Sequence, residues 1–177
     1  MKKAVVSFII VSFSIPGIAQ PSDTNSNNSS EKKSRTLQGN SIYIEICGNA
    51  TFAASLNYER MVVHSKKFYM TGRFGFGAGQ YIYNTTFIAM PLLLNFQYQL
   101  TDIFIIECGA GATLSFVPQE KRWYPFITGL AGVRVQTKKG FLFRAGFTPV
   151  YNLHPDFQTF EEFLPWGGIS LGYGFGK

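Results

Sequence analysis

The stretch FLFRAGFT, residues 141–148, alternates Phe, Phe, Ala and Phe with Leu, Arg, Gly and Thr. The stretch GISLGYGF, residues 168–175, repeats this pattern with Ile, Leu, Tyr and Phe on one face and only Gly and Ser on the other. A period of two predicts β-strands, because successive side chains of a strand point to opposite faces. The small and polar face is a poor filling for a dry core. The bulky face is therefore predicted to point outward into lipid, as in a membrane-spanning β-barrel.

The first 19 residues, MKKAVVSFIIVSFSIPGIA, have the three regions of a secretory signal peptide. Lys2 and Lys3 give the basic region, residues 4–13 the apolar region, and Gly17 and Ala19 the small residues before the cleavage site. Cleavage is predicted after Ala19. A signal anchor is the rival interpretation, but it needs about 20 apolar residues to cross a bilayer.

Residues 20–40 contain a single Leu and are otherwise almost wholly polar. Such a segment buries too little apolar surface to offset the entropy lost on ordering, so we expect a disordered periplasmic tail. Residues 41–177 remain as one domain, which we interpret as an outer-membrane β-barrel.

Turn signals divide this domain into eight segments with strand-like patterning. The predicted strands cover residues 41–48, 51–60, 67–79, 86–98, 102–114, 124–136, 140–151 and 166–175. Bacterial single-chain barrels have an even number of strands. The sequence therefore predicts an all-β fold, an eight-stranded antiparallel up-and-down transmembrane β-barrel.

The connections between these segments alternate in length, as expected for short periplasmic turns and longer outer loops. The turns VVHSKK, QLTD and TKKG are compact, whereas the outer connections are longer except for a brief one around residues 48–51. Pro91 and Pro149 fall within strand patterns, where a missing N–H removes a ladder bond. We expect a bulge at Pro91 and the outer end of strand seven at Pro149.

Six charged residues fall on the inward face of the predicted strands. Three are acidic and three are basic, and all lie near the predicted periplasmic ends: Glu45, Glu59, Arg73, Glu107, Arg134 and Arg144. An eight-stranded barrel is just wide enough for side chains to fill it, and an unpaired buried charge is costly. We expect a paired charge network in the lumen, with Glu59 beside Arg73 and Glu107 beside Arg134. A catalytic role for Glu45 or Glu107 is the alternative.

Other features exclude several function classes. The formal net charge is +6, but the basic residues do not form one run with interleaved aromatics, so nucleic-acid binding is not expected. The sequence has no Cys/His cluster with metal-ligand spacing, and neither metal nor cofactor is expected. Cys47 and Cys108 fall on opposite faces by parity, which favours two packed thiols over a disulfide.

With the signal peptide, the eight strands, the internal Glu/Arg set and the ending GISLGYGFGK, the chain resembles the small outer-membrane β-barrel proteins of Gram-negative bacteria. The resemblance covers residues 41–177. It implies a location in the cell outer membrane and a monomer in contact with outer-membrane lipid and lipopolysaccharide. It also implies assembly by the barrel-assembly machinery.

Three functions follow as hypotheses. The first is a non-enzymatic barrel with an envelope-structural, adhesive or weakly pore-forming role. The second is a lipid A-modifying barrel enzyme, for which His64 with Ser65 and His154 with Asp156 are the candidate polar groups. The third is a soluble lipocalin-like ligand carrier, which requires Ile42, Ile44, Ile46 and Phe141 to face inward.

Overall fold

The computed structural model describes residues 37–50, 53–80, 86–153 and 162–176. The predicted signal peptide and most of the predicted tail lie outside these residues. In the part of the chain that the structure describes, no helix is long and apolar enough to cross a membrane.

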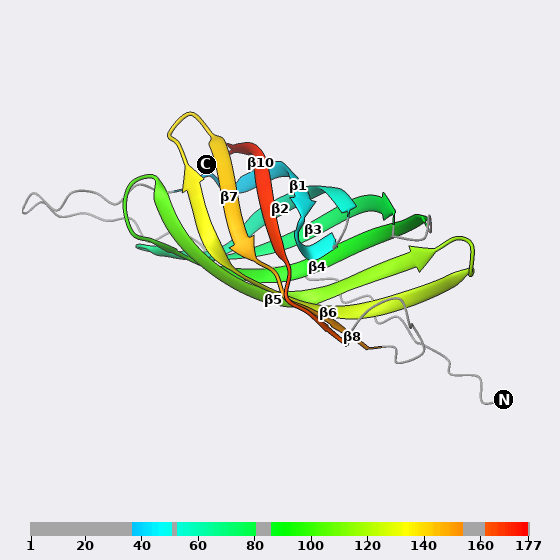
Figure 1. Ribbon diagram of the computed structural model, residues 1–177. Coiled ribbons are helices and arrows are strands. Elements are labelled where there is room, and N and C mark those ends of the chain that lie inside the picture. The colour runs from blue at the N-terminus through cyan, green and yellow to red at the C-terminus, as the bar shows by residue number, and fades with distance from the viewer. Residues whose placement is uncertain (1–36, 51–52, 81–85, 154–161, 177) are drawn as a thin grey trace, which may run out of the picture. The chain divides into compact units, whose positions relative to one another are not determined.

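Eight long strands form a closed antiparallel barrel (Figure 1). Its wall consists of β1 (Asn40–Cys47), β2 (Ala53–Ser65), β3 (Phe68–Gln80), β4 (Thr86–Gln99), β5 (Phe104–Val117), β6 (Arg122–Gln136), β7 (Phe141–Phe147) and β10 (Gly167–Phe175). Neighbouring strands pair in this order, and pairing of β10 with β1 closes the wall. The predicted eight-stranded antiparallel up-and-down fold is confirmed.

The two faces of the wall differ as the alternation predicts. Ile42, Ile44 and Ile46 of β1 are 45, 55 and 64% exposed on the outside, whereas Tyr43 and Glu45 between them are each 1% exposed. Small inward residues let the strands coil tightly around this interior. At Gly172 of β10, for example, a Cβ would collide with the Cβ of Tyr43 on β1.

The β2–β3 connection differs from the predicted six-residue turn. Strand β2 continues to Ser65, which pairs with Phe68, so only Lys66 and Lys67 form the turn. Lys66 adopts the positive φ of 41° that such a tight turn requires. One extra residue, Val62, is accommodated by a bulge between Met61 and Val63.

The prediction for Pro91 is wrong, whereas the one for Pro149 holds in part. Pro91 makes no bulge: the register of β4 is the same on both sides of it, and only the ladder to β3 lacks pairs there. Strand β7 ends at Phe147, just before Pro149, which agrees with the prediction, but the chain then resumes as β8 (Val150–Asn152), which pairs with β6 and with the short β9 (Phe163–Leu164). The carbonyl of Pro149 still accepts a bond of 2.9 Å from the N–H of Gly129. The missing N–H of a proline therefore interrupts the hydrogen bonds to one neighbouring strand without displacing its own strand.

The described part of the barrel begins at Leu37, four residues before the predicted boundary at residue 41. Leu37, the single Leu of the predicted tail, is 3% exposed and packs with Tyr69 and Ile105 inside the barrel. The backbone of Gly39 bonds to Gly176 and Met61 at 3.2 and 2.8 Å. One apolar side chain is enough to anchor this segment, because the barrel offers it an enclosed apolar site.

Leu37→Ala is expected to lower the free energy of unfolding by about 2–4 kcal/mol, the range for truncating a buried Leu. Leu100→Ala is the matched control, because Leu100 is 46% exposed and should lose well under about 1 kcal/mol. Urea titration of the refolded full-length chain measures both. Equal losses at the two positions would contradict the docking of Leu37.

Candidate functional site

The interior of the barrel holds all six charged residues predicted for the lumen. Each is at most 5% exposed: Glu45, Glu59, Arg73, Glu107, Arg134 and Arg144. They come from β1, β2, β3, β5, β6 and β7, so they converge from most of the circumference. We call this set the lumen charge network.

Four ion pairs divide the network into two parts. On one side Arg73 binds Glu45. On the other, Glu59 binds both Arg134 and Arg144, and Arg144 also binds Glu107. The contact between Arg144 and Glu59 is 2.7 Å long. Three positive and three negative groups therefore balance within one enclosed volume.

The two expected ion pairs do not form, although the six charged residues do meet in the lumen as predicted. Glu59 and Arg73 are opposite each other in the β2–β3 register, but Arg73 reaches to Glu45 instead. Arg134 crosses the interior to Glu59 rather than joining Glu107 on the adjacent strand. Long side chains can span a lumen of this width, so strand adjacency does not decide which charges meet.

Polar and aromatic side chains complete the coordination of these charges. Tyr43 lies between the two parts: its ring centroid is 5.4 Å from the guanidinium carbon of Arg73 and 4.6 Å from that of Arg144. Arg144 donates a bond of 2.7 Å to the Tyr43 hydroxyl, and Gln97 donates one of 2.9 Å to Glu59. A desolvated guanidinium over an aromatic face is stabilised by a cation–π interaction.

The residues that directly follow β1 turn into the barrel interior, and we call this segment, Gly48–Ala50, the plug. It contains the 3-10 turn η1 (Gly48–Ala50), and all three residues are buried. Asn49 donates bonds of 2.6 Å to Thr128 and 2.8 Å to the carbonyl of Gly129, both on β6. It also accepts a bond of 2.9 Å from Arg73, which ties the plug to the lumen charge network.

The backbone at the plug turns sharply inward. Cys47 and Gly48 have φ values of 61° and 76°, in the left-handed region. A Cβ at position 48 would collide with the carboxyl group of Glu45. Glycine is therefore required here for both its conformation and its size. The plug was missed from sequence, and its one visible signal was the unusual brevity of this connection.

Apolar residues cap the charged layer at both ends, contrary to the expectation that the interior has no dry core. Beyond the plug lies a cluster of Ala50, Ala53, Phe87, Ala89, Val117, Tyr124, Phe126 and Val150. Toward the β2–β3 turn lies the cluster of Leu37, Tyr69 and Ile105. The interior is thus layered, with paired charges between two apolar regions.

The two glutamates of the catalytic alternative belong to the lumen charge network. The carboxylates of Glu45 and Glu107 are held by arginines, and both are buried. His64 lies exposed near the end of β2, its ring 5.7 Å from that of Tyr69. His154 and Asp156 lie outside the described residues. Within the described ranges no group of three metal-binding side chains is present.

The two cysteines are unpaired with each other. Cys108 is exposed on the outer face, so the expectation of a packed thiol is wrong for this residue, whereas Cys47 is partly buried. The faces predicted by parity explain why no disulfide joins them.

Comparison with protein-family models, with curated proteins and with solved structures gave no match. Function therefore has to be argued from the geometry of the barrel.

A double-mutant cycle tests the pairing in the network. Arg73→Ala and Glu45→Ala should each cost about 3–5 kcal/mol of unfolding free energy, because each leaves a buried charge without its partner. The double variant should cost less than the two single changes together by about 0.5–3 kcal/mol. Urea titration gives all three values.

Arg60→Ala is the control, since Arg60 is exposed on the outside and should change stability by less than about 0.5 kcal/mol. Strict additivity of the Arg73 and Glu45 changes would disprove the pairing. Stronger coupling of Arg73 to Glu59 than to Glu45 would favour the partner predicted from the register.

Proposed function

We propose that the protein is an integral outer-membrane β-barrel with a closed lumen and a structural, non-enzymatic role in the cell envelope. The observation that carries the proposal is the distribution of side chains across the wall. Paired Arg and Glu lie inside, and large apolar residues cover the outside. A soluble protein of this size has no reason to expose such a band, because large exposed apolar patches are unfavourable in water.

The outer surface supports a lipid environment in more detail. Exposed apolar residues of the middle of the wall include Leu56, Phe74, Phe76, Leu92, Ile44 and Leu171. Exposed aromatic side chains lie toward both ends of the barrel: Tyr58, Phe68, Tyr98, Phe141 and Tyr173 toward the β2–β3 turn, and Trp123, Tyr151 and Phe163 toward the opposite end. Amphipathic rings favour the interface between lipid and water. Because bacterial barrels have short turns on the periplasmic side, we propose that the end with the two-residue β2–β3 turn lies in the periplasm and the opposite end outside the cell.

The contents of the lumen favour a structural role over a pore. The lumen charge network, the plug and two apolar clusters occupy successive levels of the interior. An adhesive role belongs to the same proposal, since the β5–β6 hairpin at the outer end exposes Lys121, Arg122 and Trp123.

The two other hypotheses receive less support. A lipocalin-like carrier requires Ile42, Ile44, Ile46 and Phe141 to line a cavity, and all four are at least 45% exposed on the outside. A lipid A-modifying enzyme requires a nucleophile next to a base near the lipid-facing rim. Outer-membrane lipid, lipopolysaccharide and the barrel-assembly machinery are the proposed partners of a monomeric barrel.

Membrane insertion predicts a cost for charge on the outside of the wall. Leu92→Arg should lower unfolding stability by about 2–4 kcal/mol in lipid vesicles, because Leu92 lies midway along β4. Leu153→Arg is the matched control: Leu153 is exposed beyond β8, past the predicted apolar band, and should lose at most about 1 kcal/mol.

These measurements belong with fractionation of the outer membrane and with gel mobility before and after boiling. The folded chain should be found in the outer-membrane fraction and migrate differently until heated. Recovery from the soluble periplasm, with equal costs for the two Arg substitutions, would favour the carrier.

Single-channel recording tests the closed lumen. The native barrel should show little steady conductance, and Asn49→Ala should increase the frequency of conducting events because the plug loses its bonds to Arg73 and β6. Asn40→Ala is the control, since the Asn40 side chain bonds to Tyr58 away from the plug. A large steady conductance in the native protein would contradict the structural role.

A further inference from the structure

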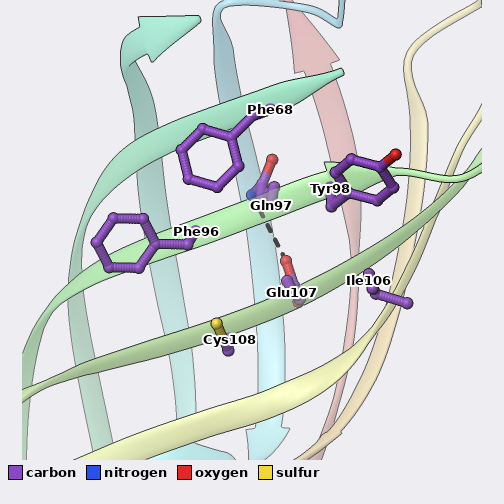
Figure 2. Close-up of a pocket in the computed structure, with 7 residues that line it drawn as sticks. All are labelled: Phe68, Phe96, Gln97, Tyr98, Ile106, Glu107 and Cys108. Atoms are coloured by element: carbon purple, nitrogen blue, oxygen red, sulfur yellow. Dashed lines mark hydrogen bonds between the residues drawn. The ribbon is translucent and has the colours of Figure 1, made fainter. Parts of the chain in front are cut away.

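The outer surface of β3, β4 and β5 contains a shallow depression of about 170 Å³. Figure 2 shows the side chains of Phe68, Phe96, Tyr98, Ile106 and Cys108 around it. Gln97 and Glu107 contribute from behind, where they bond to each other at 3.5 Å on the inward face. The lining that faces outward is therefore apolar apart from the Tyr98 hydroxyl and the Cys108 thiol.

The strand register creates this depression. Phe68 is opposite Tyr98, and Phe96 is opposite Cys108, which is small. The rings of Phe68 and Phe96 stack with centroids 6.1 Å apart and form one side. The Cys108 side chain is small, whereas neighbouring positions carry aromatic rings. The space left by this difference can hold a segment of acyl chain.

Two cations lie next to the depression. Lys66 and Lys67 form the β2–β3 turn immediately before Phe68, and both are exposed. The carbonyl of Lys67 accepts a bond of 2.8 Å from the N–H of Gln99, which holds the turn beside Tyr98. Asp102 on the neighbouring β4–β5 turn is the nearby acid in the sequence, so the positive charge prevails.

We propose that this surface binds one anionic phospholipid of the periplasmic leaflet. An acyl chain lies in the depression, and the phosphate lies at Lys66 and Lys67. The site rests on the proposed membrane function, because it needs the β2–β3 end of the barrel to lie at a lipid interface. A basic residue near a membrane surface attracts anionic headgroups, whereas a zwitterionic headgroup brings no net charge to the pair.

Cys108 provides a reporter that the protein already contains. In a Cys47→Ala background, Cys108 is the remaining thiol of the sequence. The full-length chain is folded in detergent micelles, and the rate of Cys108 alkylation by a maleimide is measured with phosphatidylglycerol or with phosphatidylcholine of identical chains. Phosphatidylglycerol should protect at concentrations about thirtyfold lower, the effect expected for two lysines that contribute about 1 kcal/mol each.

Two paired variants locate the headgroup. Lys66→Asn with Lys67→Gln should abolish the preference for phosphatidylglycerol; Asn is chosen because it tolerates the positive φ at position 66. Lys138→Gln with Lys139→Gln, in the exposed β6–β7 turn, should leave the preference unchanged. Lys66→Arg with Lys67→Arg should also retain it.

Gel mobility before and after boiling is recorded on every sample. Equal protection by the two lipids, or an equal loss of the phosphatidylglycerol preference in both Lys-to-amide variants, overturns the lipid site. If the barrel is still heat-modifiable in these samples, the proposed membrane function stands. Absence of heat-modifiable mobility in the native chain overturns the membrane function and the lipid site together. Native mass spectrometry supplies a second measurement, in which one retained phosphatidylglycerol is expected.

Discussion

The pairing of buried charges across the lumen is the interaction on which this barrel depends. A buried ion without a partner costs several kcal/mol, so three arginines and three glutamates can share one interior only if their geometry is complementary. Glu59 of β2 illustrates this, since it forms ion pairs with Arg134 of β6 and Arg144 of β7, two strands that are not neighbours of β2 in the sheet. Each of these contacts joins strands that are distant in sequence. The network therefore stabilises the closed wall specifically and would be lost if the sheet opened.

The plug extends the same principle along the barrel axis. Asn49 links Arg73 to the β6 strand, and the Thr113 hydroxyl on β5 donates a bond of 2.8 Å to the Asn49 carbonyl. A single polar residue thus satisfies groups on three sides of the lumen. It does so only because Gly48 lets the chain turn inward next to Glu45. The apolar cluster beyond it is separated from the charges by this layer of hydrogen bonds, which explains how a dry region and six ionised groups coexist in one narrow barrel.

The sequence predicted the features that depend on local alternation, and it failed where the cross-section of the barrel decides. Strand β4 was predicted as residues 86–98 and is Thr86–Gln99, and the inward residues were identified by parity alone. The partner of Arg73 was not identified, because the order of the strands does not show how far a side chain reaches across the lumen. Leu37 was assigned to a disordered tail because the segment around it is polar on average. Such an average does not show that one apolar side chain can anchor the segment. The bulge at Val62 could not be predicted either, because an extra residue in one strand is recognised only when its pairing with the neighbouring strand is known.

The inner network and the apolar outer surface are two consequences of one register. In β5, Glu107 points inward to Arg144 and the next residue, Cys108, points outward into the depression. A slip of one residue would exchange them, because side chains alternate with a period of two. It would place a carboxylate among the apolar side chains of the outer surface and remove one of the two carboxylate partners of Arg144 at the same time. The two penalties act in the same direction, so the charges inside specify which apolar residues face outward. The lipid site proposed at the β2–β3 turn needs no additional structural feature, because the register that pairs the lumen charges also sets Phe96 and Cys108 side by side.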